Sequence, residues 1–182
     1  MSTAMTPPLA ALIYPDERHD IEDLLEGVAR RLQQSGRQVG GLVHRQSRYA
    51  NGNKCMRLVD LRSGQQFEMT EDLGAASQAC SLNPQALARA SVVLRQALAD
   101  GVELAVVNCF GQLEAAGGGF VQEIAAFVEA GIPVVTAVAA RHEAGWQSFT
   151  GGAFVRLPVD EQALLHWCRQ QLQREDQGDR SC

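Results

Sequence analysis

Lysine is almost absent from the chain: Lys54 is the single lysine among 16 basic residues, and all the others are arginine. A phosphate-loop lysine and a Schiff-base lysine are therefore excluded unless Lys54 fills the role. Long apolar runs are also absent, since none approaches the roughly 18 residues that a membrane span requires. Residues 1–8 show neither the basic region nor the apolar core of a signal peptide. We therefore expect a cytoplasmic protein.

The cysteines lack the spacing of a disulfide framework or a metal site. There are five of them, an odd number, and no two form a CxxC pair. In a reducing cytoplasm this pattern favours free thiols. No histidine stands at ligand spacing from Cys55 or Cys80, so we predict no metal site. No motif identifies a cofactor.

The charge balance and the length limit the class of protein. Acidic side chains outnumber basic ones by 21 to 16, which gives a formal net charge of −5. This balance argues against binding to nucleic acid or to an anionic membrane. The 182 residues are 46% hydrophobic, which is enough to bury one core. We expect a single α/β domain over residues 9–173, between a disordered N-terminus (1–8) and a flexible C-terminal tail (174–182).

Apolar blocks alternate with amphipathic ones, which predicts strands separated by helices. Strands are predicted over 9–14, 39–44, 102–107, 132–138 and 154–155, and a hairpin over 56–61 and 66–69. Helices are predicted over 20–36, over 83–101, before Gly131 and over 161–173. Because the strands are apolar throughout, we predict a mostly parallel sheet with helices on both faces, that is, a three-layer α/β sandwich.

In such sheets ligands bind at the carboxyl ends of the strands, which nominates the loops 14–20, 108–119 and 139–150. Loop 14–20 stands where a phosphate-binding loop would be, but it contains no glycine, lysine, serine or threonine. Five acids crowd this loop and the start of the next helix: Asp16, Glu17, Asp20, Glu22 and Asp23. They should repel a triphosphate, which leaves either a solvated loop with a capped helix or a site for a cation or polar ligand.

Loop 108–119 begins with Asn108 and Cys109, where a hydrolysing P-loop protein has acidic residues for magnesium and water. Asn108 can hydrogen-bond a ligand or brace the loop. Glu114 can offer a carboxylate or cap a helix. The run Gly117-Gly118-Gly119 can present N–H groups to an anion or form a flexible loop.

The segment 44–62, which we name the basic hairpin, holds one acid, Asp60, and five basic residues: Arg45, Arg48, Lys54, Arg57 and Arg62. It is either a footprint for an anion or partner, or a solvated hairpin with charge on its exposed face. Cys55 lies inside this segment, where a nearby cation can activate a thiol, and Cys80 follows it. In loop 139–150, Arg141 and Trp146 can offer a cation and an aromatic face to a planar or anionic ligand, or pack against the sheet edge.

The order of these blocks resembles the bacterial family known as domain of unknown function 2478, which is related to thermophile-type nucleoside-triphosphatases. The resemblance covers about residues 9–173 and is carried by Gly41-Leu-Val, Cys55-Met56, Asp60-Leu61, Ser63-Gly64, Cys80-Ser-Leu82, Val106-Val-Asn-Cys-Phe-Gly111, Glu114, Gly131-Ile-Pro-Val134, Trp146 and Phe149. It implies a P-loop NTPase-like topology with an inserted β-hairpin. Genes of that family often lie beside molybdenum-uptake genes, so the resemblance also implies a role near molybdate or molybdoenzyme supply.

The related triphosphatases keep a full phosphate loop and an acidic strand end, and this chain departs from them at both. The family's usual lysine between the asparagine and the phenylalanine is Cys109 here. The leading hypothesis is therefore a non-hydrolytic protein that binds a small anion or nucleotide-like metabolite, or acts as a regulator, on a degenerate P-loop NTPase fold.

The candidate ligand-binding residues are Lys54, Cys55, Arg57, Cys80, Asn108, Phe110, Gly111, Glu114, Gly117, Gly118, Arg141 and Trp146. No catalytic or metal-binding residue is predicted. The alternatives are a divergent nucleoside-triphosphatase, or a hydrolase, using Glu114 or Cys55, and an interaction module that docks an acidic partner through the basic hairpin. A small anion or metabolite is the expected partner, nucleic acid is not expected, and a homodimer is left open.

Overall fold

The computed structural model describes residues 7–15, 20–71, 81–107 and 110–178. These residues form a seven-stranded sheet in the order β4-β3-β2-β7-β8-β1-β9 and a two-stranded sheet of β5 and β6. Strands β2, β7, β8, β1 and β9 run parallel, whereas β3 is antiparallel to its neighbours β2 and β4. The strands are β1 (Leu9–Tyr14), β2 (Val39–Arg48), β3 (Lys54–Asp60), β4 (Gln66–Glu68), β5 (Thr70–Glu71), β6 (Ser81–Leu82), β7 (Leu104–Val107), β8 (Val134–Ala139) and β9 (Val155–Leu157).

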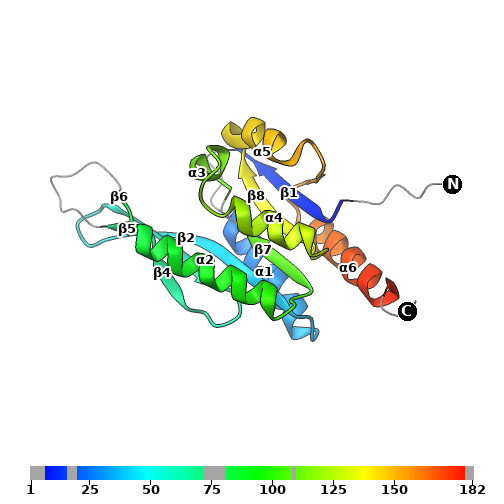
Figure 1. Ribbon diagram of the computed structural model, residues 1–182. Helices are drawn as coiled ribbons and strands as arrows, with labels where there is room; N and C mark the ends of the chain where they lie inside the picture. The colour runs from blue at the N-terminus through cyan, green and yellow to red at the C-terminus, as the bar shows by residue number, and fades with distance from the viewer. Residues whose placement is uncertain (1–6, 16–19, 72–80, 108–109, 179–182) are drawn as a thin grey trace.

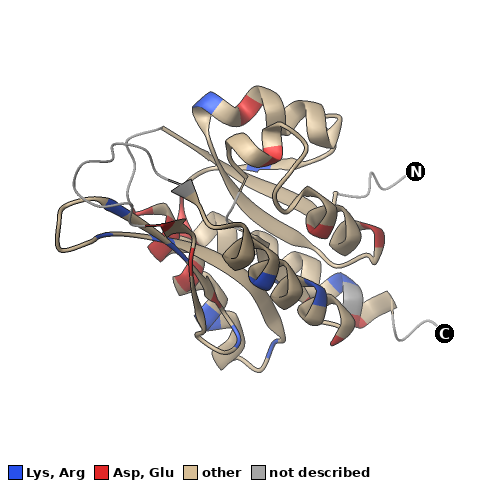
Figure 2. Ribbon diagram, turned by 60° about the vertical axis from the view of Figure 1, so that its left-hand side comes forward, with Lys and Arg blue, Asp and Glu red and all other residues tan. Residues whose placement is uncertain are grey.

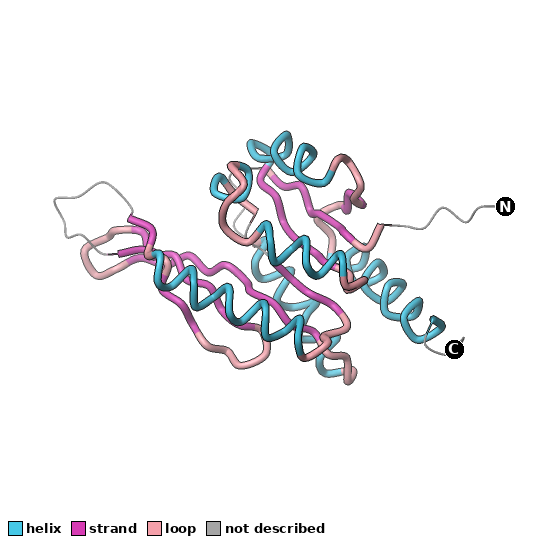
Figure 3. The backbone as a smooth tube through the Cα atoms, in the orientation of Figure 1, coloured by secondary structure: helices cyan, strands magenta, loops and turns pink. Residues whose placement is uncertain are grey.

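Helices cover both faces of the large sheet (Figures 1 and 3). One face carries α1 (Ile21–Gln34) and α6 (Glu161–Gly178), and the other carries α2 (Pro84–Ala99), α4 (Val121–Glu129) and α5 (Glu143–Thr150). The short helix α3 (Gln112–Ala115) and the 3-10 helix η1 (Ala140–His142) lie near the strand ends. The predicted three-layer α/β sandwich with a mostly parallel sheet is therefore confirmed.

Strand β1 shows why the sequence of a central strand is apolar throughout. Side chains alternate between the two faces of a strand, so Ala11 belongs to the core beneath α2 and α4, together with Phe127. Ala10 and Leu12 belong to the core beneath α1 and α6, together with Leu25. A strand buried on both faces has no position at which a charged side chain reaches water.

The helix starts follow the capping signals in the sequence only in part. The Asn83 side chain accepts hydrogen bonds from the backbone N–H groups of Gln85 (3.0 Å) and Ala86 (3.1 Å), and Pro84 follows at the first helical position, as expected for the start of α2. Asp20 stands at the N-cap position of α1, but its side chain makes no capping hydrogen bond. The acids of the first turn, Glu22 and Asp23, still lie favourably with respect to the helix dipole.

Strand β2 is longer than the sequence predicts. Residues 45–48 are polar and were expected to form a loop, but they continue the strand and pair antiparallel with β3, with Arg45 opposite Arg57. An antiparallel pair can leave one face in water, so polar residues are tolerated there. The predicted hairpin between β3 and β4 is present, and the buried Asp60 carboxylate accepts hydrogen bonds from the backbone N–H groups of Arg62 and Ser63 at its turn.

Two predictions near the C-terminus are wrong in their bounds. Residues 139–150 were expected to form a loop, but most of them form η1 and α5, where Gly145 packs closely against Ala115. Helix α6 extends to Gly178, beyond the end predicted at Gln173.

Among the described residues, no helix has the length and apolar character that crossing a bilayer requires. The described cysteines, Cys55 and Cys168, are buried free thiols, and burial raises the pKa of Cys168 to about 12. The other cysteines, Cys80, Cys109 and Cys182, lie outside the described residues.

Gly41 is expected to be the glycine least tolerant of replacement. Its φ is +131°, and a Cβ there would stand 1.9 Å from the carbonyl oxygen of Val106 on the neighbouring strand. We predict that Gly41→Ala lowers the free energy of unfolding by roughly 3–5 kcal/mol, measured by urea unfolding.

The matched control is Gly36→Ala, which has a φ of +89° but open space around the Cβ position. This variant isolates the effect of backbone strain, and we expect it to lower the free energy of unfolding by roughly 1–3 kcal/mol. Equal losses in the two variants would show that the contact with Val106 does not constrain the fold.

Candidate functional site

A cavity of about 520 Å³ lies at the carboxyl ends of the parallel strands, and we name it the strand-end pocket. It reaches Tyr14 at the end of β1, Phe110 and Gly111 after β7, and Ala139 at the end of β8. This is the edge of the sheet at which α/β proteins bind ligands. Its volume falls within the range of pockets for small organic ligands, about 300–1,000 Å³.

The wall of the pocket is mostly apolar, and its polar groups come from several different elements. The apolar lining consists of Met56, Leu58, Met69, Leu82, Leu87, Phe110, Leu113, Phe120, Ala137 and Ala139. The groups that carry charge or hydrogen-bonding capacity are Tyr14, Glu22, His44, Gln112, Glu114, Arg141 and His142. An apolar cavity with a few polar groups suits a ligand with a flat or apolar body and a polar edge.

Glu22 and His44 form a pair in this lining, from the first turn of α1 and from β2. The Nδ1 atom of His44 lies 3.4 Å from Oε1 of Glu22. The Nε2 atom of His44 is buried and has no hydrogen-bond partner among the described residues. A buried polar atom without a partner lowers the stability of the folded state.

Glu114 is buried and organises the segment between β7 and α4. Its carboxylate accepts hydrogen bonds from the backbone N–H groups of Gly111 (2.9 Å) and Phe120 (3.3 Å). Burial raises the pKa of Glu114, although these backbone hydrogen bonds act in the opposite direction. A Cβ at Gly119 would stand 2.0 Å from Oε1 of Glu114, so the glycine there makes room for the carboxylate. Of the two roles left open by the sequence, the capping role is the one that this geometry supports.

The structure brings four of the predicted ligand-binding residues together in the strand-end pocket: Phe110, Gly111, Glu114 and Arg141. Lys54, Cys55, Arg57, Gly117, Gly118 and Trp146 are outside its lining, and Asn108 and Cys80 lie outside the described residues. Residues 16–19 and 108–109, which belong to the first two strand-end loops, also lie outside the described part of the chain.

Trp146 packs beneath the pocket rather than in it. It is fully buried and makes an edge-to-face contact with Phe110, with ring centroids 4.9 Å apart, and another with Phe154 at 5.6 Å. Phe110 lines the pocket, so Trp146 supports the wall through this contact. The alternative left open by the sequence, packing against the sheet, therefore describes Trp146 better than ligand contact does.

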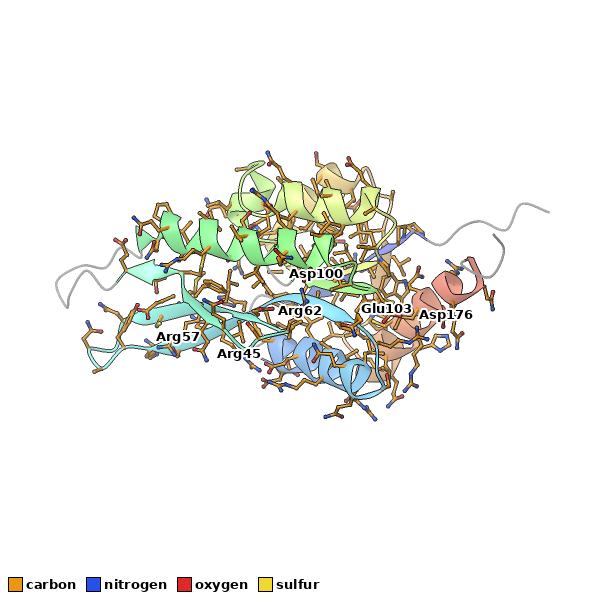
Figure 4. All side chains as sticks on the ribbon, turned by 60° about the horizontal axis from the view of Figure 1, so that its bottom comes forward. Arg45, Arg57, Arg62, Asp100, Glu103 and Asp176 are labelled. Atoms are coloured by element: carbon orange, nitrogen blue, oxygen red, sulfur yellow. The ribbon has the colours of Figure 1, made fainter. Side chains whose placement is uncertain are left out.

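Two of the five basic residues of the basic hairpin are ion-paired within the protein. Arg45 contacts the carboxylates of Asp23 and Glu26 on α1, and Arg62 donates to Asp100 at 2.8 Å, which holds the pKa of Asp100 below its ordinary value. Figure 4 shows Arg45 and Arg57 on neighbouring strands and Arg62 beside Asp100. In Figure 2 blue and red segments lie side by side in this region. Among the described residues, Lys54, Arg57 and Arg48 have no ion-pair partner, although Arg48 donates to the backbone carbonyl of Gly52, so a binding surface here would have to use these three.

Cys55 is fully buried on β3 and is not positioned to meet a ligand in the pocket. Tyr49 lies in the same hairpin and donates its hydroxyl to the Glu68 carboxylate, which raises the pKa of Tyr49 to about 12. Its complete burial is what identifies Cys55 as a packing residue, in line with the usual behaviour of buried thiols.

The sequence reasoning missed His44 and the two methionines of the pocket wall, Met56 and Met69. His44 follows a buried apolar block, so the rule that ligands bind at strand ends could have nominated it. The hairpin methionines carried no such signal, because only the antiparallel extension of the sheet brings β3 to this edge.

The sheet order, the helices on both faces and the strand-end pocket define a three-layer α/β protein with a P-loop NTPase-like fold. A human cancer-related nucleoside triphosphatase, solved in solution, has a similar structure with a TM-score of 0.62. The match covers 88% of this chain and 93% of that chain at 15% sequence identity, so it shows the fold.

The chain belongs to the DUF2478 family of proteins of unknown function, whose model matches residues 9–167. It is also 37% identical over 162 residues to the molybdenum import ATP-binding protein ModC 2 of Bradyrhizobium diazoefficiens. That match covers 88% of this chain but 18% of the relative, so the chain spans less than one fifth of the relative's length.

Replacing Glu114 should destabilise the segment that it organises. We predict that Glu114→Ala lowers the free energy of unfolding by about 2–4 kcal/mol, because the N–H groups of Gly111 and Phe120 lose their acceptor. Glu129→Ala, at an exposed site on α4, is the control and should have little effect. An equally small loss in Glu114→Ala would contradict the bracing role.

The pH dependence of stability gives a second measure of the same contact. The folded state raises the pKa of Glu114, so the stability that its protonated form contributes is present at low pH and lost as the pH rises through the raised pKa. The difference in unfolding free energy between the wild type and Glu114→Gln should therefore shift against the wild type as the pH rises from the ordinary pKa of a glutamate through the raised pKa of Glu114. A constant difference would argue against the buried carboxyl.

Proposed function

We propose that the protein is a regulatory, non-hydrolytic module that binds a small organic anion or a nucleotide-like metabolite in the strand-end pocket. The observation that carries this proposal is the pocket itself, a cavity of about 520 Å³ with an apolar wall and an edge of ionisable side chains. A bare tetrahedral oxyanion would leave most of that apolar wall uncovered, whereas a ligand with a ring would cover it.

The lack of hydrolysis is supported by the residues available around the pocket. The single lysine, Lys54, is exposed at the start of β3 and does not line the cavity. The segment that follows β1 contains no glycine, lysine, serine or threonine, and an asparagine and a cysteine follow β7. These positions lack the groups with which P-loop proteins hold magnesium and neutralise the charge of a triphosphate.

A connection with molybdenum supply is supported by the relative at 37% identity. That relative is named as a molybdenum import ATP-binding protein, and this chain matches a part of it. The part of the relative that matches this chain is a small segment of a much longer protein. A ligand-binding domain in such a position fits a regulatory role. We propose that ligand binding in the pocket reports on the state of molybdenum metabolism.

Binding is tested by calorimetry with ATP, GTP, molybdate and tungstate, with Leu87→Trp as a variant that fills the pocket. Leu87 lines the cavity from α2, so the larger ring should weaken binding at least about tenfold. Val92→Trp is the matched control, because Val92 lies on the same helix and is 59% exposed. Absence of binding by all four compounds at millimolar concentration, or equal binding by the two variants, would count against the proposal.

A divergent nucleoside-triphosphatase is the second candidate, because two carboxylates, Glu22 and Glu114, line the pocket. The measurement is phosphate release from ATP and GTP with magnesium. We expect the wild type, Glu22→Gln and Glu114→Gln to show the same background rate. Release by the wild type that either substitution lowers at least about tenfold would replace the non-hydrolytic proposal with an enzymatic one.

A further inference from the structure

The strand-end pocket is apolar at one end and polar at the other. Met56 and Leu58 on β3 line the apolar end. Arg141 and His142 of η1, which follow β8, line the polar end, together with Tyr14 at the end of β1. Strands β2 and β7 lie between β3 and β8, so the two ends are about 14 Å apart at the usual spacing of strands. A ligand that spans the pocket therefore needs an apolar body and a polar group at one end.

Arg141 is the residue of the polar end whose charge and hydrogen-bonding role are fixed. It is exposed and lines the pocket, so a molecule in the pocket can reach it. A guanidinium is always protonated and only donates hydrogen bonds. The Nε–H group of Arg141 donates to Nε2 of His142 at 3.2 Å, which restrains the plane of the guanidinium. Because a guanidinium has five N–H donors, Arg141 can serve a neighbour and an anionic ligand together.

The charges around the pocket favour a ligand with a single negative charge. Among the described residues of the lining, Arg141 is the only arginine or lysine, whereas Glu22 and Glu114 contribute carboxyl groups. Glu143, which lies close to Arg141 in the sequence, is outside the lining and is ion-paired with Arg156. A carboxylate carries one charge and matches two parallel N–H donors of a guanidinium. A phosphate monoester carries nearly two charges at neutral pH, and a triphosphate carries more.

The apolar wall determines the shape of the rest of the ligand. Met56 and Met69 contribute polarisable sulfur, which contacts aromatic rings favourably, and Phe110 and Phe120 contribute aromatic surface. A ligand with a flat ring would remove this surface from water and gain the corresponding free energy. An inorganic oxyanion would reach Arg141 but would leave the wall uncovered.

We propose that the strand-end pocket binds an aromatic carboxylate, with the ring against the apolar wall and the carboxylate held by the guanidinium of Arg141, which His142 orients. This inference rests on the proposed function, since it names the ligand class of the same pocket. It goes beyond it in assigning Arg141 as the residue that selects a singly charged anion and His142 as a positioning residue for Arg141.

The test uses pairs of ligands that differ in charge but share their shape. Calorimetry measures binding of 2-naphthoate and indole-3-carboxylate, and of their neutral amides, with AMP, ATP and sodium molybdate in parallel. Arg141→Gln removes the positive charge, and Arg141→Lys keeps the charge but loses the planar pair of donors. Arg169→Gln is the matched control, because Arg169 is exposed on α6 and does not line the pocket. Urea unfolding confirms that each variant is folded at the assay temperature.

At least one of the two carboxylates should bind the wild type and Arg169→Gln equally, and at least about tenfold more tightly than its amide. Arg141→Gln should abolish this preference for the carboxylate, and Arg141→Lys should retain part of it. His142→Ala should reduce the preference by a smaller factor than Arg141→Gln and leave binding of the amide unchanged. Unchanged amide binding separates the orientation of Arg141 from a general loss of packing in the pocket.

Two results would overturn the inference and leave the proposed function in place. The first is a carboxylate that Leu87→Trp excludes from the pocket but whose preference over its amide is as large in Arg141→Gln as in the wild type. The second is binding of AMP, ATP or molybdate in the pocket when neither carboxylate binds. Failure of every compound, with GTP and tungstate included, would overturn the inference and the proposed function together.

Discussion

Strand β2 takes part in two different pairings, and the site depends on how it changes from one to the other. Its first part runs parallel to β7, as far as the pair Leu42 and Val107, and its remainder runs antiparallel to β3. The two strands approach so closely at Gly41 that a Cβ there would stand 1.9 Å from a carbonyl oxygen of Val106. Because β2 continues beyond the end of β7, it carries His44 past the parallel sheet, and β3 brings Met56 and Leu58 to the same edge. If the sheet consisted of its parallel strands alone, the strand-end pocket would lack the wall that β3 forms on this side.

The glycines after β7 serve a carboxylate that belongs to the protein itself. In phosphate-binding loops, glycines let backbone N–H groups approach an anion. Here the N–H groups of Gly111 and Phe120 are directed at the carboxylate of Glu114, and Gly119 leaves space for it. The anion is thus supplied by the chain, which leaves those N–H groups occupied. The same arrangement engages both carboxylate oxygens of Glu114, whereas Glu22 and His44 lie beside each other elsewhere in the pocket lining.

The sequence was sufficient for the parallel core and insufficient for the details of the site. Strands such as β1 and β7 are apolar on both faces, and that pattern identifies buried parallel strands without knowledge of their neighbours. The polar half of β2 has no such signature, since its strand conformation comes from pairing with β3. Trp146 and Cys55 have the residue types of functional groups, but burial assigns them to packing. His44 became visible as a candidate only through its position beside Glu22, a contact between residues 22 positions apart.

The similarity to a nucleoside triphosphatase shows the fold, whereas the chemistry depends on the side chains that line the pocket. A triphosphate needs several cations to neutralise its charge, whereas the described lining offers mostly apolar surface, Arg141 and the carboxyl groups of Glu22 and Glu114. The scarcity of lysine and the acids at the start of α1 are therefore unfavourable for a pocket that would hold a chain of phosphates.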